Sequence, residues 1–188
     1  TNPKVKSVSF VGSTPIAQYV YATGTAHDKR VQALGGAKNH AVILPDADLD
    51  LAADAMVNAG FGSAGERCMA ISACVAVGPI ADDLVAKIAE RAADIKTGDG
   101  TRDSDMGPLV TRAHRDNVTP EMSVYTDEIF GPVLSVIRVE SYDEAMDLVN
   151  SNPYGNGTAI FTNDGGAARR FQNEVQVGMV GINVPIPV

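Results

Sequence analysis

The segment Ile71–Val77 constrains the fold more than any other stretch, because apolar residues occupy both of its alternating faces. Such a strand is typical of a parallel sheet that is covered by helices on both sides. Other short apolar segments alternate with segments whose apolar residues recur at helical spacing. This alternation predicts an α/β fold with a largely parallel sheet flanked by helices.

Cap and turn residues delimit the predicted elements. Ser141-Tyr142-Asp143-Glu144 has the Ser-x-x-Glu pattern of a capping box. Pro15 suits the first turn of a helix that Ser13 or Thr14 can cap. The expected strands are 5–11, 30–33, 41–44, 71–77, 133–139, 158–162 and 179–184, and helices are expected to begin near 14, 45, 79, 111, 141 and 164.

The charge of the chain excludes several classes of partner. The net charge is −8 and the isoelectric point is about 4.7. Nucleic acid and anionic membrane surfaces are therefore poor partners, because both require a basic face. No apolar run of about eighteen residues occurs, so no membrane-spanning helix is expected.

Length and cysteine use indicate the kind of protein. The 188 residues suit one domain, with or without an arm, and include only two cysteines, Cys68 and Cys74. A disulfide scaffold would need more cysteines, so we expect the protein to be located in the reducing cytoplasm. The start, Thr1-Asn2-Pro3-Lys4, lacks an initiator Met, and we expect it to come from within a longer chain.

The Gly-rich segment 61–70 places Cys68 directly before the apolar strand and directly after Glu66 and Arg67. A free cysteine titrates near ~8.5, and a neighbouring guanidinium or oriented N–H groups would lower that pKa. A thiol in this position is a candidate nucleophile. The alternative is a small buried hydrophobic residue, which most cysteines are.

Two other features are open to more than one interpretation. Gly12 and Ser13 precede a predicted helix, whose N-terminus is either an anion site or an ordinary capped end. The histidines, His27, His40 and His114, show no metal-binding spacing, so no metal is expected. A Cys–His dyad that uses Cys68, as in a cysteine hydrolase, stays open.

Five segments resemble motifs of the aldehyde dehydrogenase superfamily, in the order in which that superfamily carries them. Each is weak alone, but together they cover nearly the whole chain. Residues 29–40 and 61–70 are most similar to its acylating branch, the methylmalonate-semialdehyde dehydrogenases, which also act on malonate semialdehyde. The motifs are Ser9-Phe10-Val11-Gly12-Ser13-Thr14, Leu34-Gly35-Gly36, Gly65-Glu66-Arg67-Cys68, Glu128-Ile129-Phe130-Gly131-Pro132 and Asn152-Pro153-Tyr154-Gly155.

The resemblance implies that Cys68 attacks the aldehyde carbon and becomes a thioester after hydride leaves for NAD. The Cys68 N–H is a candidate donor to the oxyanion, and the superfamily's second donor, an Asn side chain, precedes Thr1. Arg67 is expected to bind the carboxylate of a semialdehyde acid in a bidentate way. The alternative for Arg67 is a surface salt bridge, perhaps with Glu66.

The resemblance also implies four contacts to NAD. Gly12 and Ser13 resemble the contact to a cofactor phosphate, and Glu128 resembles the ligand of the nicotinamide ribose. Phe130 is expected to pack near the ring. The alternatives are that Glu128 is an ordinary loop acid and that Phe130 is an ordinary core residue. Most lone carboxylates and aromatic residues have these structural roles.

The residue at position 33, Ala33, best distinguishes a hydrolytic from an acylating reaction. Hydrolytic members of the superfamily have Glu-Leu-Gly-Gly, in which the Glu is the general base for water, whereas this chain has Ala33-Leu34-Gly35-Gly36. General-base help is typically worth ~10²–10⁴-fold. Without it, the thiol of coenzyme A is the favoured acyl acceptor. The alternative is that Ala33 only packs and another residue supplies the base.

The resemblance implies that residues 1–188 are a catalytic domain without the nucleotide-binding part and without the C-terminal arm. The superfamily carries further residues between the helix at 111–117 and the Glu128 motif. A missing segment is therefore expected at Val118-Thr119.

The expected function is NAD-dependent oxidation of methylmalonate or malonate semialdehyde to propanoyl- or acetyl-coenzyme A, with loss of carbon dioxide. The full-length form is expected to be a homodimer or homotetramer. One alternative is a hydrolytic aldehyde dehydrogenase that releases a free acid. The other is a non-catalytic domain of the same fold.

Overall fold

The computed structural model describes residues 2–117 and 123–186. The chain forms two compact units, Thr1–Gly36 and Ala37–Val188, which we call the N-terminal and C-terminal units. The expectation of a single catalytic domain over 1–188 stays a prediction, and the missing segment expected at 118–119 lies outside the described residues. No helix in the described ranges is long and apolar enough to cross a membrane.

The N-terminal unit is a β–α–β arrangement. Strand β1 (Ser7–Val11) leads to helix α1 (Thr14–Thr25), and strand β2 (Arg30–Leu34) pairs with β1 in parallel. Pro15 lies in the first turn of α1, as expected. Ser13 is at the N-cap, but its side chain makes no capping hydrogen bond, so that expected bond is absent.

The pair Gly35-Gly36 lies close to Thr14 at the start of α1. Thr14 Oγ1 accepts a hydrogen bond from the Gly36 N–H at 3.0 Å. A Cβ on Gly35 would lie 2.9 Å from the same Thr14 oxygen and 3.2 Å from Thr14 Cα. Gly35 thus lets the chain after β2 pass close to the start of α1.

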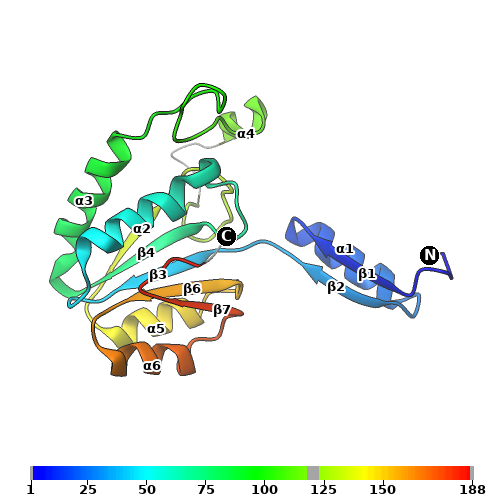
Figure 1. Cartoon of the computed structure of the whole chain (residues 1–188). Helices are drawn as coiled ribbons and strands as arrows, with labels where there is room; N and C mark the ends of the chain where they lie inside the picture. The colour runs from blue at the N-terminus through cyan, green and yellow to red at the C-terminus, as the bar shows by residue number, and fades with distance from the viewer. Residues whose placement is uncertain (1, 118–122, 187–188) are drawn as a thin grey trace. The chain divides into compact units, whose positions relative to one another are not determined.

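The C-terminal unit is built on a five-stranded parallel sheet with the order β5-β4-β3-β6-β7 (Figure 1). The sheet therefore matches the predicted class, and β4 has the predicted bounds. The strands are β3 (Asn39–Ile43), β4 (Ile71–Val77), β5 (Ser135–Val139), β6 (Gly157–Phe161) and β7 (Met179–Ile182). The helices are α2 (Leu49–Phe61), α3 (Ala81–Ala93), α4 (Arg112–Asn117), α5 (Tyr142–Asn150) and α6 (Gly165–Glu174), with short 3-10 turns at Gly62–Gly65 and Gly78–Ile80.

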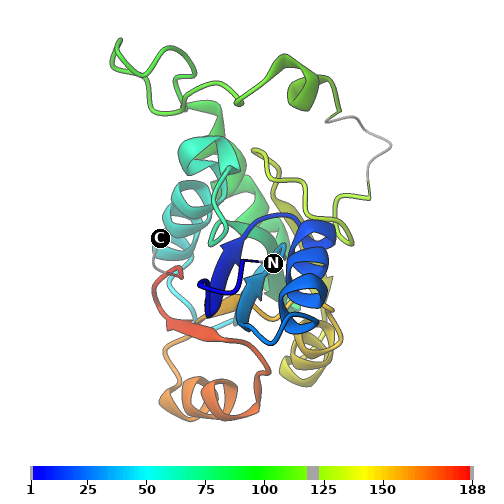
Figure 2. The same ribbon diagram turned by 90° about the vertical axis from the view of Figure 1, so that its right-hand side faces the viewer.

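Helices cover both faces of this sheet, which is why its interior strands are apolar on both sides. Helices α2 and α3 lie on one face and α5 and α6 on the other (Figures 1 and 2). Ala41 and Ile43 of β3 belong to the core under α2 and α3, whereas Val42 belongs to the core under α5 and α6. The alternation of the strand thus divides its side chains between two cores.

Side-chain caps fix three helix starts. Asp48 accepts hydrogen bonds from Asp50 N and Leu51 N at the start of α2, and Asp164 does the same for α6. Ser141 Oγ accepts from Glu144 N at 3.2 Å, as the capping box predicts. The Glu144 carboxylate accepts from Glu140 N at 2.8 Å, one residue earlier than the usual box.

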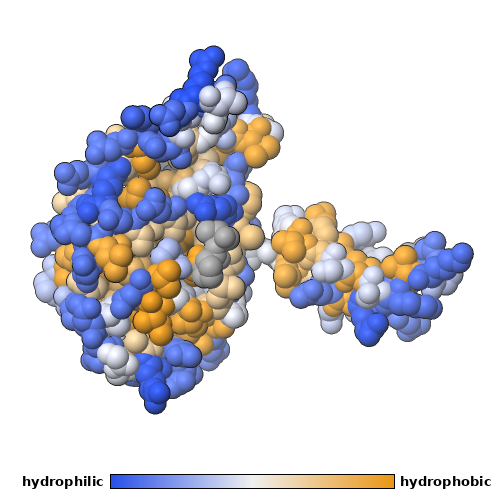
Figure 3. Space-filling model, viewed as in Figure 1, coloured by the Kyte–Doolittle hydropathy of each residue, from blue (hydrophilic) through white to orange (hydrophobic). Residues whose placement is uncertain are grey.

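Strand β7 is an edge of the sheet and carries exposed apolar side chains. Met179 and Ile182 are about two-fifths exposed, and Val184, just after the strand, is 50% exposed. Apolar atoms gather over this part of the C-terminal unit in Figure 3. An exposed apolar edge strand is a surface on which another chain can pair.

Candidate active site

The Cys68 loop, residues 62–70, joins the end of α2 to the start of β4. Three consecutive residues in it, Ser63, Ala64 and Gly65, have left-handed backbone angles, with φ of 52°, 57° and 70°. A Cβ on Gly65 would lie 2.1 Å from the Gly131 carbonyl oxygen. Glycine at 65 therefore lets this loop pack backbone to backbone against the chain at Gly131.

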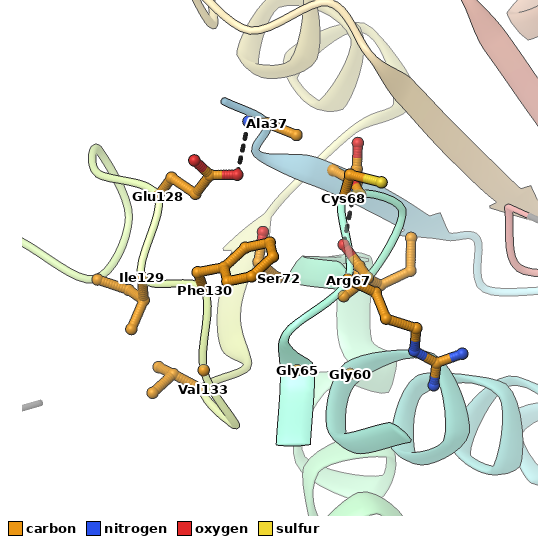
Figure 4. A pocket seen from close by; sticks show the side chains of 14 residues that line it. Ala37, Gly60, Gly65, Arg67, Cys68, Ser72, Glu128, Ile129, Phe130 and Val133 are labelled. Atoms are coloured by element: carbon orange, nitrogen blue, oxygen red, sulfur yellow. Dashed lines mark hydrogen bonds between the residues drawn. The ribbon is translucent and has the colours of Figure 1, made fainter. Parts of the chain in front are cut away.

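A small pocket brings together four of the residues predicted from the sequence. Arg67 and Cys68 line it from the Cys68 loop, and Glu128 and Phe130 line it from the facing loop (Figure 4). The other lining residues are Ala37, Asn39, Gly60, Gly65, Ala70, Ile71, Ser72, Ile129, Gly131 and Val133.

The two cysteines differ sharply in environment. Cys68 is exposed in the loop, and Cys74 is fully buried in β4. Burial raises the pKa of the Cys74 thiol to about 12, because the apolar core disfavours the thiolate. Of the two thiols, only that of Cys68 is therefore accessible.

The Arg67 side chain runs toward the end of α2 (Figure 4). Its Nε donates to the Gly62 carbonyl at 3.1 Å and its Nη2 to the Asn58 carbonyl at 3.2 Å. The Asn58 carbonyl also accepts from the Gly62 N–H, so Arg67 bonds to the last turn of α2 and to the residue that ends it. No ion pair between Arg67 and Glu66 occurs among the described residues.

Glu66 instead holds the loop from its other side. Its Oε1 accepts from the Val110 N–H at 3.2 Å and lies 3.9 Å from His114 Nε2. His114 Nε2 in turn lies 2.8 Å from the Phe130 carbonyl oxygen. Glu66 and His114 thus connect the Cys68 loop with the loop that carries Phe130.

The Glu128 loop, residues 123–134, is attached to the start of β3 by three neighbouring residues. Glu128 Oε1 accepts from the Ala37 N–H at 2.9 Å (Figure 4). Lys38 Nζ donates to the Val124 carbonyl at 3.0 Å, and His40 Nε2 lies 3.3 Å from Tyr125 Oη. Residues 37–40 therefore fix where the Glu128 carboxylate sits.

Burial shifts the pKa of both basic side chains in this segment. It lowers the pKa of Lys38, although the negative charges of Glu128 and Asp127 oppose the shift. It lowers the pKa of His40 from 6.5 to about 4, and the nearby Lys38 charge adds to the effect. His40 is therefore neutral at physiological pH.

Phe130 is neither fully packed nor in a relaxed backbone conformation. Its φ is 54° and its exposure is 43%. It is therefore not the ordinary core residue that was one alternative from the sequence. A strained, exposed aromatic residue beside a pocket is a candidate ligand contact.

Gly12 and Ser13 lie in the N-terminal unit, at the start of α1. The Ser13 side chain is exposed and makes no capping bond, so its hydroxyl and the first N–H groups of α1 are available to an anion. A helix start of this kind can bind an anion. Among the described residues, no group of three or more His, Cys, Asp or Glu side chains is placed to hold a metal.

Sequence reasoning did not single out two residues that contact the Cys68 loop. The side-chain amides of Asn39 and Asn156 both donate to the Cys68 carbonyl oxygen, at 2.9 and 2.8 Å. Asn39 begins β3 and Asn156 directly precedes β6, the neighbouring parallel strand. Polar residues at the starts of adjacent parallel strands were the available signal, because such starts meet at one sheet edge.

Comparison with known proteins identifies the family. The aldehyde dehydrogenase family model matches residues 1–119 and 115–188. The chain is 52% identical, over 228 aligned positions and 99% of its length, to malonate-semialdehyde dehydrogenase of Pseudomonas aeruginosa PAO1. It is 44% identical, again over 99% of its length, to malonate-semialdehyde dehydrogenase 2 of Geobacillus kaustophilus.

Two solved structures are similar over the whole chain. One is methylmalonate-semialdehyde dehydrogenase of Oceanimonas doudoroffii, with a TM-score of 0.94 and 47% identity. The other is a protein of Sinorhizobium meliloti 1021 assigned as a methylmalonate-semialdehyde dehydrogenase and complexed with NAD, with a TM-score of 0.95 and 45% identity.

The chain covers 46% and 47% of the two sequence relatives and 47% of each of these structures. It therefore spans about half the length of the proteins it matches. Within that half, the family model accounts for every residue, and the fold and the exposed cysteine agree with the motifs found in the sequence. The chain belongs to the aldehyde dehydrogenase family.

Proposed function

We propose that this chain supplies the catalytic thiol of an NAD-dependent, coenzyme A-acylating dehydrogenase for methylmalonate or malonate semialdehyde. The observation that carries the proposal is the exposed Cys68 in a pocket shared with Arg67, Glu128 and Phe130. The names of the relatives support the substrate class, and the NAD complex of one similar structure supports the cofactor.

In this proposal, the Cys68 thiolate attacks the aldehyde carbon and forms a hemithioacetal. The Cys68 N–H donates to the oxygen that becomes negative, where a preorganised donor contributes most. No hydrogen bond from this N–H to another described residue occurs, so it is available for that task. After loss of the hydride, the sulfur carries the acyl group as a thioester.

When bound, NAD supplies the acceptor for the hydride. Gly12, Ser13 and Glu128 are the residues that would hold it. The uncapped start of α1 supports the phosphate contact. One Glu128 oxygen accepts from the Ala37 N–H, and the other, which bonds to none of the described residues, would accept from a ribose hydroxyl. The exposed Phe130 ring would pack beside the nicotinamide.

We propose that Arg67 binds the carboxylate of the substrate. Two of its five N–H donors bond to the carbonyls of Gly62 and Asn58, and the other three bond to nothing else in the described part of the chain. The carbonyl contacts also fix the position of the guanidinium at the end of α2. A fixed guanidinium suits planar carboxylate recognition better than a flexible lysine would.

Coenzyme A is proposed as the acyl acceptor because Ala33 cannot act as a base. In the balanced reaction, the thiol of coenzyme A displaces Cys68, and the carboxylate of the substrate leaves as carbon dioxide. The proton of the coenzyme A thiol ends on the carbon from which the carboxylate leaves. The nucleophilicity of a thiolate reduces the need for help from a protein base.

The remaining proposals concern the whole protein. We propose that these residues form the catalytic part of a longer polypeptide, supported by their coverage of about half of each relative. We propose a homodimer or homotetramer, for which the exposed apolar edge at β7 offers a surface. The two unpaired thiols support a cytoplasmic location.

The test is turnover by the purified full-length protein with NAD and malonate semialdehyde, with and without coenzyme A. NADH absorbance follows the oxidation, and mass spectrometry identifies the product. We expect steady NADH formation and acetyl-coenzyme A only when coenzyme A is present. In the Ala33→Glu variant, slow release of free acid without coenzyme A is expected to increase. Equal turnover without coenzyme A in the parent protein would assign it to the hydrolytic class.

A further inference from the structure

We propose that Asn39 and Asn156 are positioning residues that clamp the Cys68 carbonyl and thereby aim the Cys68 N–H at the reacting oxygen. This inference rests on the proposed role of Cys68 as the nucleophile. It assigns a function in acyl transfer to two amide side chains that touch neither the thiol nor the cofactor contacts described above.

The clamp closes on one atom from two neighbouring strands. Asn39 Nδ2 donates to the Cys68 carbonyl oxygen at 2.9 Å and to the Ala70 carbonyl oxygen at 2.9 Å. Asn156 Nδ2 donates to the same Cys68 oxygen at 2.8 Å and lies 3.1 Å from Met69 Sδ. The peptide that follows Cys68 is therefore held from the starts of both β3 and β6.

The peptide that precedes Cys68 is held as well. Its carbonyl, that of Arg67, accepts from the Ala70 N–H at 3.1 Å. With both flanking peptide planes fixed, the backbone angles of Cys68 are fixed, and so is the direction of its N–H. Ala70 takes part in both sets of contacts, because its N–H bonds to Arg67 and its carbonyl to Asn39.

The orientation of the Asn39 side chain is set by its amide N–H donors, which bond to the carbonyls of Cys68 and Ala70. The side chain is buried, at 2% exposure, and its Oδ1 has no hydrogen-bond partner among residues 2–117 and 123–186. Turning the amide over would place that oxygen against two carbonyl oxygens, so the contacts to Cys68 and Ala70 fix its direction. An unpaired buried acceptor destabilises the fold, which favours a reason other than stability for keeping Asn at this position.

The test compares two reactions of Cys68 that differ in their need for an oxyanion donor. With p-nitrophenyl acetate, the thiolate attacks the carbonyl carbon, the bond to p-nitrophenolate breaks, and acetyl-Cys68 remains. With iodoacetamide, sulfur displaces iodide and no oxyanion forms. Neither reaction needs NAD, coenzyme A or the semialdehyde, so a wrong substrate assignment does not affect the result.

We expect Asn156→Ala and Asn39→Ala to slow acetylation by roughly tenfold or more, because a displacement of about 1 Å can cost ~10²-fold. Alkylation by iodoacetamide is expected to stay within about threefold, since its transition state needs no such donor. The half-buried Asn156 is the safer site should Asn39→Ala not fold. Peptide mass spectrometry confirms that Cys68 is the residue modified.

The matched control is Asn150→Ala. Asn150 also donates its amide to a carbonyl, that of Glu174, and accepts from Gln176 N, but it lies at the end of α5. It is expected to leave both rates of Cys68 unchanged. Unchanged acetylation in the Asn156 variant, or equal losses in both reactions, would overturn the positioning role. Absence of any Cys68 reaction in the parent protein would instead refute Cys68 as nucleophile.

Discussion

Cys68 and Cys74 lie in adjoining segments, yet one thiol is exposed and the other is buried in the sheet. Only a thiolate reacts with alkylating agents, and burial holds the pKa of Cys74 at about 12. We therefore expect iodoacetamide to modify Cys68 at least ~100-fold faster than Cys74 in the folded protein, given the dependence on thiolate and access. Timed alkylation with peptide mass spectrometry measures both rates. Comparable rates would contradict the placement of Cys74.

His40 gives the protein a specific dependence on pH. Its pKa is about 4 in the folded protein and near 6.5 in the unfolded chain, so below pH 6.5 the unfolded state binds the proton more readily. The contribution of neutral His40 to the unfolding free energy is thus complete above pH 6.5, and it is lost as the pH falls toward 4. Between pH 7 and 5.5 the loss is about 1 kcal/mol of unfolding free energy.

Urea unfolding at pH 7 and 5.5 measures this loss. His40→Gln is expected to reduce the pH-dependent loss, whatever it does to stability at pH 7. His27→Gln is the control, because His27 is exposed. The same pH dependence in the parent and His40→Gln proteins would show that His40 is not the group responsible.

At the scale of elements, the Cys68 loop depends on a glycine that accommodates a neighbouring backbone. Gly65 combines a φ of 70° with a contact in which a Cβ would lie 2.1 Å from the Gly131 oxygen. Gly65→Ala is expected to destabilise the protein by about 2 kcal/mol or more, since strain and backbone overlap add. It should also slow modification of Cys68, because the loop must move.

Gly107→Ala is the control for Gly65→Ala, since nothing lies within 4 Å of a Cβ at position 107. Its unfolding free energy is expected to stay within about 0.5 kcal/mol of the parent value. Thermal or urea unfolding of both variants provides the comparison. Equal stabilities of the two variants would mean that the Cys68 loop does not need glycine at 65.

The elements themselves were largely predictable from the sequence because their signals are local. Ile71–Val77 is the strand predicted, and Ser141 caps its helix as predicted. The contacts around Cys68 were not predictable in this way. Asn39 and Asn156 reach the Cys68 carbonyl across 29 and 88 residues of sequence, and only the parallel order β4-β3-β6 brings them together.

The residues of the candidate site were foreseen better than their contacts. The motifs predicted Arg67, Cys68, Glu128 and Phe130, and all four line one pocket. Their hydrogen-bond partners were not foreseen: Arg67 bonds to carbonyls of α2 and its turn, and Glu128 to the Ala37 N–H. Such backbone partners leave no mark in the residue types, because any residue supplies an N–H and a carbonyl.

At the scale of the whole molecule, the residues with proposed roles are divided between the two units. Gly12, Ser13 and Ala33 belong to the N-terminal unit, and Cys68 and Glu128 to the C-terminal unit. The proposed phosphate contact and Ala33 therefore belong to the N-terminal unit, and the proposed covalent chemistry belongs to the C-terminal unit. In that chemistry, an acyl group on Cys68 awaits coenzyme A.

The most direct test is peptide mass spectrometry of the full-length protein after mixing with NAD and malonate semialdehyde without coenzyme A. We expect an acyl group on the Cys68 peptide, in an amount equal to the first burst of NADH. Addition of coenzyme A should remove that group and release acetyl-coenzyme A. NADH formation with Cys68 unmodified throughout, or an acyl group on another residue, would contradict the account.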